Sequence, residues 1–469
     1  MFPVALHTLG CKLNQLESEA FADSFKKAGF PLIPPGEEMQ GQGPCPGPRP
    51  GIIIINTCTV TSKADQKCRR LIRKLLRENP DSCVIVVGCY AQLDSEQIAA
   101  LEEESGAMPG ADGFRRLFVL GGNSVDGAGP AKSPLLELPE ILRQAGGGKP
   151  SDIVASWIEE SAGRDPFGFK PEDFAFHSRG YLKIQDGCDN SCTYCRVRLA
   201  RGRSVSLPKE DALAQVRSFE KKGCAELMIT GVNITQYDYS GCNLAGLLEY
   251  LLEGTSTIAL RLASLEPERI NERLASVLAH PRIRPHFHLS VQSGSDTVLR
   301  AMGRAYTSQA VMDGAALLRS AKDNPFLACD IIAGFAGETE AEFERTFALC
   351  EQINFAWIHA FPYSRRPGTA AFSLGNPVCE RDATRRVEAL TALAWQGRTS
   401  YAKSWLNREL SAIVEKSGSP AGQCRAVSEN YLKLIVNCPD AVPLPAAAIR
   451  CTPVSLCEGA DAVCRLNLR

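Results

Sequence analysis

A loop with three closely spaced cysteines constrains this chain more than any other feature. Cys188, Cys192 and Cys195 have a C-x3-C-x2-C spacing directly after a short apolar segment. Three thiolates on one tight loop can hold three irons of a [4Fe–4S] cube, whereas such clusters normally have four cysteine ligands. A zinc site is the alternative, but zinc ligands usually occur as two separated pairs, and no second pair lies nearby. The spacing therefore predicts an iron–sulfur cluster with one open corner.

The composition bounds the rest of the molecule. A chain of 469 residues is long enough for two or three domains. The net charge of −1 gives no global basic field, so nucleic acid would have to be bound by local patches. The 19 cysteines are scattered, and the first residues lack a charged and then apolar leader. We expect a protein of the reducing cytoplasm that does not enter a membrane.

Residues 1–121 alternate between strand-like and helix-like segments, which predicts an α/β domain with a parallel sheet. The expected strands are Val4–Leu9, Ile52–Ile55, Cys83–Gly88 and Leu117–Leu120, and the expected helices are Glu17–Ala28, Lys63–Leu76 and Ser95–Glu104. Residues 31–51 are expected to form a loop, and the Gly- and Pro-rich residues 122–175 a linker.

Three cysteines of this first domain each follow a predicted strand: Cys11, Cys58 and Cys89. Carboxyl ends of parallel strands lie along one edge of a sheet, where α/β folds place their sites. The three thiols can therefore converge although they are far apart in sequence. The residues alone leave open the alternative that they are buried structural cysteines.

Residues 176–395 contain six further strand–helix units, which predicts a partial barrel with its site at the carboxyl ends of the strands. The expected strands are Tyr181–Gln185, Glu226–Thr230, Ala259–Ala263, His286–Val291, Leu327–Ala333 and Phe355–Phe361. The expected helices are Glu210–Lys222, Leu244–Leu252, Ile270–Leu278, Ser308–Ser320 and Glu340–Ile353. We expect His286 and His288 to pack or to form hydrogen bonds rather than to catalyse. Short strands and turns in residues 396–469 predict a small all-β module.

The cysteine loop, with Tyr194 before its last cysteine, resembles that of the radical S-adenosylmethionine (SAM) enzymes. The longer string His177–Cys195, followed by Ala200-Arg-Gly-Arg203, resembles the methylthiotransferase branch. The resemblance implies a (β/α)6 barrel, SAM on the open iron, and a C-terminal TRAM domain for RNA. It implies that Cys11, Cys58 and Cys89 hold a second [4Fe–4S] cluster, and that the clusters, not an acid or base, carry the chemistry. The polar strand ends would match the surroundings of SAM, so Thr230, Gln292 and Asp330 are predicted cofactor contacts, although ordinary turn chemistry is the alternative for each. Tyr194 of the cysteine loop is a further predicted cofactor contact.

Leu9–Gln15 and Asn56–Thr61 are most similar to the branch that adds a methylthio group to C2 of N6-threonylcarbamoyladenosine beside the tRNA anticodon. Val197-Arg198 departs from the Ile-Pro pair usual there. Two alternatives remain: a methylthiotransferase for an aspartate of a ribosomal protein, and a non-catalytic iron–sulfur protein that binds RNA or carries electrons. The family implies an electron donor such as flavodoxin or ferredoxin.

Two basic patches adjoin the cysteine loops, and lysines and arginines bind RNA phosphates by charge. The arginines expected to contact tRNA are Arg69, Arg70, Arg73, Arg198, Arg201 and Arg203. A solvated helix face and a surface loop are the alternative.

Overall fold

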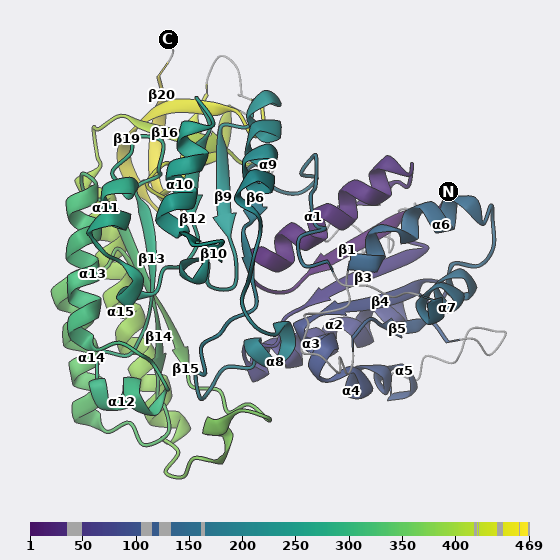
Figure 1. Cartoon of the computed structure of the whole chain (residues 1–469), viewed down its shortest axis with the longest axis horizontal. Helices are drawn as coiled ribbons and strands as arrows, with labels where there is room; N and C mark the ends of the chain where they lie inside the picture. The colour runs from purple at the N-terminus through teal and green to yellow at the C-terminus, as the bar shows by residue number, and fades with distance from the viewer. Residues whose placement is uncertain are drawn as a thin grey trace. The chain divides into compact units, whose positions relative to one another are not determined.

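A computed structural model of the chain (Figure 1) describes residues 1–34, 49–104, 115–121, 133–160, 165–416, 420, 422–438, 444–458 and 460–467. The chain forms two compact units, which are described separately. The N-terminal unit comprises Met1–Phe176, Asp186–Asp189 and Cys195–Ser204. The C-terminal unit comprises His177–Gln185, Asn190–Tyr194 and Val205–Arg469.

The N-terminal unit is built on a parallel sheet with the strand order β2-β1-β3-β4-β5. Its strands are β1 (Val4–Thr8), β2 (Leu32–Ile33), β3 (Ile52–Thr57), β4 (Cys83–Gly88) and β5 (Leu117–Val119). Strands β3 and β4 are buried along their whole length, as their unbroken apolar runs predict for a sheet covered on both faces. The predicted α/β domain is confirmed, and the two-residue strand β2 lies in the stretch expected to be a loop.

Helices connect these strands. They are α1 (Lys12–Lys27), α2 (Ser62–Glu78), α3 (Cys89–Leu93), α4 (Ser95–Ala99) and α5 (Leu101–Glu104). Two of them, α1 and α3, begin at cysteines of the predicted set. Helix α1 has Cys11 as its N-cap residue, whereas the sequence predicted a start at Glu17. Thr61 caps α2 by accepting a hydrogen bond from the Ala64 amide. The sequence predicted one helix over Ser95–Glu104, whereas the structure has two short helices there, α4 and α5.

The described part of residues 122–175 corrects the prediction of a linker. It forms η1 (Ser133–Leu136), α6 (Leu138–Gln144) and α7 (Pro150–Glu160). Leu135, Leu138, Val154 and Trp157 are buried in the same core as residues of β1, β3 and α1. The sequence did not predict this packing, because the segment is rich in Gly and Pro and its apolar side chains lie only in short amphipathic stretches. Residues 122–132 and 161–164 of the predicted linker lie outside the described part.

The C-terminal unit begins with two three-stranded parallel sheets, ordered β12-β9-β6 and β13-β14-β15. Parallel bridges from Leu260 to Ile283 and from Leu265 to Leu289 join them into one six-stranded partial barrel. The strands are β6 (Gly180–Lys183), β9 (Glu226–Thr230), β12 (Ala259–Leu262), β13 (His286–Gln292), β14 (Phe326–Ala333) and β15 (Trp357–Pro362). All six match the predicted strands to within two residues at every end, which confirms the predicted barrel.

The remaining elements connect and cover the barrel strands. The helices are α9 (Lys209–Lys221), α10 (Leu244–Glu253), α11 (Glu272–Leu278), α12 (Asp296–Ala301), α13 (Ser308–Ala321), α14 (Glu340–Ile353) and α15 (Glu380–Ser404), whereas α8 (Val197–Arg201) belongs to the N-terminal unit. Short segments are β7 (Gln185–Asp186), β8 (Val205–Ser206), β10 (Asp238–Tyr239), β11 (Cys242–Asn243), η2 (Ile234–Gln236), η3 (Pro267–Arg269) and η4 (Ala370–Ser373). Within the described residues, no helix is both long enough and apolar enough to cross a membrane.

A closed five-stranded β-barrel ends the chain, with the order β16-β17-β18-β20-β19 and pairing between β16 and β19. Its strands are β16 (Leu410–Val414), β17 (Gln423–Ser428), β18 (Lys433–Asn437), β19 (Ala448–Cys457) and β20 (Ala460–Leu466). The predicted all-β module is therefore present, but the expected boundary at residue 396 falls inside α15.

A buried charge network joins this small barrel to the amino ends of the large-barrel strands. Glu226, the first residue of β9, accepts two hydrogen bonds from Arg261, at 2.7 and 2.9 Å, and one from Arg284 at 2.9 Å. Arg261 is fully buried; it also donates to the Ser428 carbonyl at 3.1 Å and lies 5.3 Å from the centre of the Tyr431 ring. Burial acts to raise the pKa of Glu226, but the surrounding guanidinium groups outweigh it and the pKa is lowered.

Replacing Glu226→Gln should destabilise the fold by about 3–5 kcal/mol at neutral pH, because it leaves buried arginines without their counter-charge. Thermal melting or urea unfolding measures the loss, and Glu253→Gln on the exposed end of α10 is the matched control. A pKa lowered by folding stabilises the fold above the ordinary glutamate value and loses that effect as the pH falls through the lowered pKa. The gap between wild type and variant should therefore narrow on acidification; a constant gap would contradict the assignment.

Candidate active site

The structure brings Cys11, Cys58 and Cys89 together at one edge of the N-terminal sheet. Each follows a strand, and β1, β3 and β4 are neighbours in the sheet. Burial and the proximity of Cys11 and Cys89 raise the pKa of Cys58 to about 12, which places the three thiols in one electrostatic environment. The predicted convergence is thus present in the fold.

Close backbone approach shapes this edge. Gly10 has a φ of +145°, and a side chain there would meet the Cβ of Cys58 at 2.9 Å. Asn14, in the first turn of α1, donates to the Thr57 carbonyl at 2.9 Å and so ties the loop after β1 to the end of β3. The Asn14 and Gly10 of the string Leu9–Gln15 therefore serve to bring the loops of Cys11 and Cys58 together.

Arg201 lies at the same edge, which the sequence did not indicate. Its side chain is buried, and its Nη1 atom lies 3.1 Å from carboxylate oxygens of both Glu17 and Asp186. Its Nε donates to the Cys89 sulfur at 3.3 Å. Burial acts to lower the pKa of Arg201, but Cys89, Glu17 and Asp186 raise it above its ordinary value, so the group is a permanent cation. The thiolate is the form of cysteine that binds metal, and Arg201 places a fixed positive charge next to the sulfur of Cys89.

The six arginines expected to contact RNA differ in their surroundings. Arg201 is buried in the network just described and presents no group to the surface. Arg69 donates to the Tyr90 hydroxyl at 2.7 Å, and Arg73 pairs with Glu104 at 2.6 Å. Arg198 donates to the Asp189 carbonyl at 3.3 Å, whereas Arg70 and Arg203 are exposed. Burial and partners therefore leave Arg70 and Arg203 as the arginines of this set with the most open surface.

The loop of the second cysteine set is shaped by Gly187 and by local hydrogen bonds. Gly187 has a φ of +70°, and a Cβ there would lie 1.9 Å from the Arg203 carbonyl oxygen, so only glycine fits. The Cys188 amide donates to the Gly202 carbonyl at 3.1 Å. The sulfur of Cys195 accepts from the Val197 amide at 3.4 Å. Cys188, Cys192 and Cys195 are all partly exposed, which leaves room for a group bound on the loop.

A second arginine, also missed from the sequence, donates to a sulfur of this loop. Arg304 lies 3.1 Å from the Cys192 sulfur and 3.1 Å from the Glu266 carboxylate. Burial acts to lower its pKa, but Tyr194, Tyr306, Cys192 and Glu266 raise it above its ordinary value. Within the described residues, no three His, Cys, Asp or Glu side chains are close enough to share one metal ion. The donor set instead suits a larger cube, in which each thiolate binds a different iron.

The four predicted SAM contacts lie in the C-terminal unit. Thr230 is buried at the end of β9, and Gln292 ends β13 with a φ of +65°. Asp330 lies inside β14 rather than at its end, with a carboxylate oxygen 3.1 Å from Nε2 of His288. Tyr194 packs edge-on against Phe335 with ring centres 6.4 Å apart. Contact of these four residues with SAM stays a prediction.

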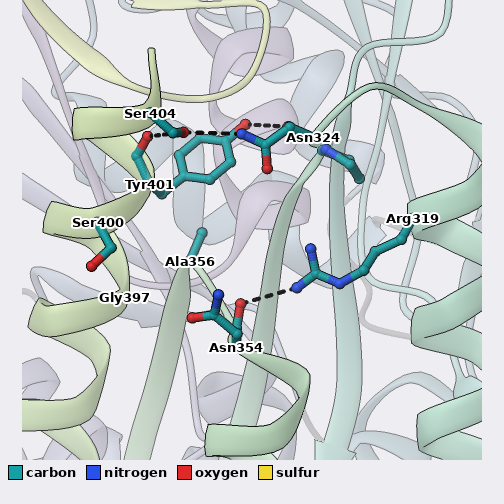
Figure 2. A pocket seen from close by; sticks show the side chains of 9 residues that line it. Arg319, Asn324, Asn354, Ala356, Gly397, Ser400, Tyr401 and Ser404 are labelled. Atoms are coloured by element: carbon teal, nitrogen blue, oxygen red, sulfur yellow. Dashed lines mark hydrogen bonds between the residues drawn. The ribbon is translucent and has the colours of Figure 1, made fainter. Parts of the chain in front are cut away.

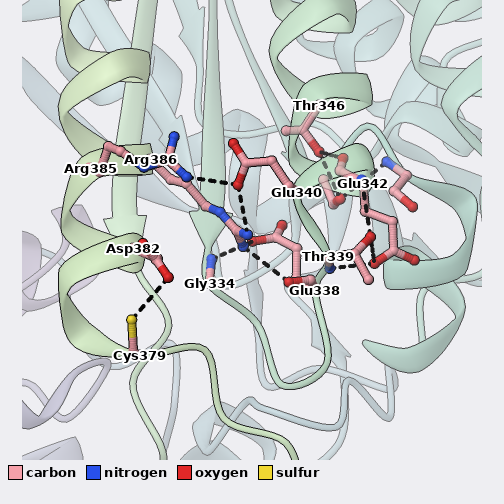
Figure 3. A network of polar contacts seen from close by, with 12 residues as sticks. Gly334, Glu338, Thr339, Glu340, Glu342, Thr346, Cys379, Asp382, Arg385 and Arg386 are labelled. Carbon is pink, nitrogen blue, oxygen red and sulfur yellow. Dashed lines mark hydrogen bonds and ion pairs between the residues drawn. The ribbon is translucent and has the colours of Figure 1, made fainter.

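The loop after β14 is held by a charge network (Figure 3). The Gly334 amide donates to the Glu338 carboxylate at 2.6 Å, and Arg386 of α15 pairs with that carboxylate at 2.7 Å. Thr339 and Glu342 form a capping box at the start of α14. The glycine-rich turn that follows Asp330 is therefore rigidly placed at the carboxyl end of the barrel.

A small cavity of about 130 Å³ lies at the other end of the same strands (Figure 2). It is lined by Asn324 before β14 and Ala356 before β15, and by Arg319, which donates to the Asn354 carbonyl at 3.0 Å. Because barrel sites form at the carboxyl ends of strands, this cavity is separate from the candidate active site.

Comparison with known proteins decides the family. Residues 182–350 match the Radical SAM superfamily, and residues 3–110 match the uncharacterized protein family UPF0004. The threonylcarbamoyladenosine tRNA methylthiotransferase MtaB of Treponema pallidum is 40% identical, over 92% of this chain and 94% of that protein. The chain belongs to the threonylcarbamoyladenosine tRNA methylthiotransferase family.

Further relatives support this membership. The family member from Thermotoga maritima is 33% identical over 88% of this chain and 87% of that protein. A tRNA-2-methylthio-N(6)-dimethylallyladenosine synthase of Cereibacter sphaeroides is 30% identical over 95% of both proteins. Membership of the family confirms the predicted resemblance and the predicted cofactors, SAM and [4Fe–4S] clusters. The assignment of individual cysteines stays a prediction, which the two convergent arrangements fit.

Arg201→Met should lower both the stability and the iron content of the reconstituted protein. The change leaves Glu17 and Asp186 as buried carboxylates without their cation, at a cost of about 3–5 kcal/mol, and removes the donor to Cys89. Thermal melting and iron analysis measure the two effects. Arg77→Met, an exposed arginine in the last turn of α2, is the matched control. Full iron content and wild-type melting in Arg201→Met would rule out this role.

Proposed function

We propose that this protein is an enzyme that adds a methylthio group to C2 of N6-threonylcarbamoyladenosine, next to the anticodon in tRNA. The observation that carries the proposal is the combination of two three-cysteine arrangements in one chain. One is the C-x3-C-x2-C loop, and the other is the convergence of Cys11, Cys58 and Cys89 at a sheet edge. Relatives named for this reaction cover most of the chain at 33% and 40% identity.

In this proposal each cysteine set holds one [4Fe–4S] cluster. Cys188, Cys192 and Cys195 ligate the cluster that binds SAM, and Cys11, Cys58 and Cys89 ligate the auxiliary cluster. When bound, the clusters and SAM supply the one-electron chemistry, the sulfur and the methyl group that protein side chains cannot provide. The chain itself contributes the thiolates, the arginines that donate to them and the pocket that positions the substrate.

The arginines tune the two sites from the protein side. Arg201 donates to Cys89, and Arg304 donates to Cys192. Hydrogen bonds to cluster sulfurs and nearby positive charge raise the reduction potential of a cluster. Each proposed cluster thus has one buried cation, fixed by carboxylates, that offsets the negative charge of three thiolates.

Membership of the family supports tRNA as the substrate. Arg70 and Arg203 are exposed cations that suit contact with tRNA phosphates. Tyr194, Thr230, Gln292 and Asp330 are the proposed SAM contacts. The proposed electron donor is a flavodoxin or a ferredoxin, and the proposed location is the cytoplasm.

Nucleoside analysis of tRNA from a deletion strain tests the substrate. The 2-methylthio form of N6-threonylcarbamoyladenosine should disappear and return with the wild-type gene and with Cys242→Ala, a cysteine outside both sets. Genes carrying Cys58→Ala or Cys192→Ala should not restore it. Persistence of the methylthio nucleoside in the deletion strain, with no second enzyme present, would refute the proposed substrate.

Iron analysis of the purified protein tests the two clusters. The reconstituted wild type should hold about eight irons per chain, and Cys58→Ala about four, because each [4Fe–4S] cluster contributes four. The variant should still cleave SAM to 5′-deoxyadenosine, since its other cysteine loop is intact. About four irons in the wild type would contradict the second cluster.

A further inference from the structure

Strand β15 exposes a row of rings on one face. Its alternate residues Trp357, His359 and Phe361 point to one side, because side chains of a strand alternate between its faces. His359 is exposed, and Phe361 is 42% exposed. His359 is paired in register with Asp330 of the neighbouring strand β14, so the row borders one of the proposed SAM contacts.

The rings of His359 and Phe361 are nearly parallel. Their planes differ by 9°, and their centres are 6.4 Å apart. Stacked nucleobases follow one another at about 3.4 Å, so a base lying between two rings needs a separation of roughly 6.8 Å. The intervening residue, Ala360, points to the opposite face of the strand and does not fill the gap. We call this pair of exposed, nearly parallel rings the slot, because the separation of their centres is close to the value that one stacked base requires.

Further side chains adjoin the ring of His359. On the side of His359, the ring of His288 lies 5.3 Å away at 27°, and the Asp330 carboxylate lies 3.1 Å from that ring. Beyond His359, Trp357 turns its ring to 80° and packs against Trp395 at 5.1 Å, which ends the parallel row. A row meant only for core packing would be buried, whereas His359 and Phe361 remain accessible.

A cation follows the row of rings in the sequence. Arg365 is exposed, four residues after Phe361, and its guanidinium lies 5.3 Å from the centre of the Phe372 ring. In the described part of the chain, no carboxylate pairs with it. Proteins that bind single-stranded nucleic acid combine aromatic stacking surfaces with positive charge along the phosphate backbone. The row and Arg365 together match that combination, which favours RNA over an apolar peptide.

We propose that one unpaired base of the tRNA anticodon loop stacks between His359 and Phe361, with Arg365 contacting a neighbouring phosphate. The inference rests on the proposed function, since it takes tRNA as the substrate. The slot contacts the flat face of a base and not its edge, so it positions the loop without selecting its sequence. It lies one strand from Asp330, on the side where the proposed SAM contacts are found.

Binding of a fluorescent anticodon stem–loop containing N6-threonylcarbamoyladenosine to the reconstituted holoenzyme tests the slot. One stacked base is worth about 1–3 kcal/mol, so Phe361→Leu and His359→Ala should each raise the Kd roughly 5- to 150-fold. Phe361→Tyr, which keeps a flat ring, should bind within about twofold of wild type. Phe347→Leu, which removes a partly exposed ring of α14 outside the slot, is the matched control and should not change the Kd.

Iron content and melting temperature confirm that each variant is folded and loaded. An unchanged Kd in Phe361→Leu, in an enzyme that still modifies the stem–loop, would overturn the slot and leave the proposed function intact. A wild-type enzyme that neither binds nor modifies the stem–loop would overturn both.

Discussion

One buried cation, Arg201, is the interaction on which the candidate active site depends. It contacts Glu17 of α1, Asp186 next to the second cysteine loop, and the sulfur of Cys89. Burial, and after it the proximity of Cys11 and Cys89, raises the pKa of Cys58, so negative charge at this sheet edge is unfavourable without a counter-charge. A permanent positive charge 3.3 Å from the Cys89 sulfur supplies that counter-charge. Because Arg201 also holds Asp186, the same side chain sets the position of the residue that precedes Gly187 and Cys188.

The C-terminal unit also contains a buried charge network, which joins its two barrels. Glu226 gathers Arg261 and Arg284 at the amino ends of the barrel strands, and Arg261 in turn reaches the Ser428 carbonyl of the small barrel. The Tyr431 ring lies 4.1 Å from the ring of His286, which fits the packing role expected for that histidine. A desolvated network of this kind adds little net stability, but it is costly to break. It therefore favours one arrangement of the two barrels of this unit over others.

The local sequence pattern predicts most strands of both units, but it does not predict β2 or the contacts of Arg201 and Arg304. The barrel strands were predictable because most are rich in apolar residues and are bounded by turn residues, and the prediction for β9 is correct at both ends. Strand β2 is two residues long, too short to show a periodicity. Arg201 and Glu17 are 184 positions apart, and Arg304 and Cys192 are 112 apart. No spacing rule connects such pairs, so Arg201 looked like an RNA contact and Arg304 gave no signal at all.

The two ends of the large barrel differ in role: the amino ends contact the small barrel, and the carboxyl ends carry the candidate site residues. At the amino ends, each charged group of the Glu226 network faces an opposite charge, and Tyr431 of the small barrel packs against the ring of His286. The carboxyl ends carry Thr230, Gln292 and the loop that Glu338 holds in place. Between the two ends, β15 pairs with β14 and, in the described part of the chain, with no other strand. A closed barrel would bury His359 and Phe361 as core residues. The side chains of β15 alternate between its two faces. Because the sheet stops at β15, the rings on one of these faces stay accessible and form a row beside Asp330.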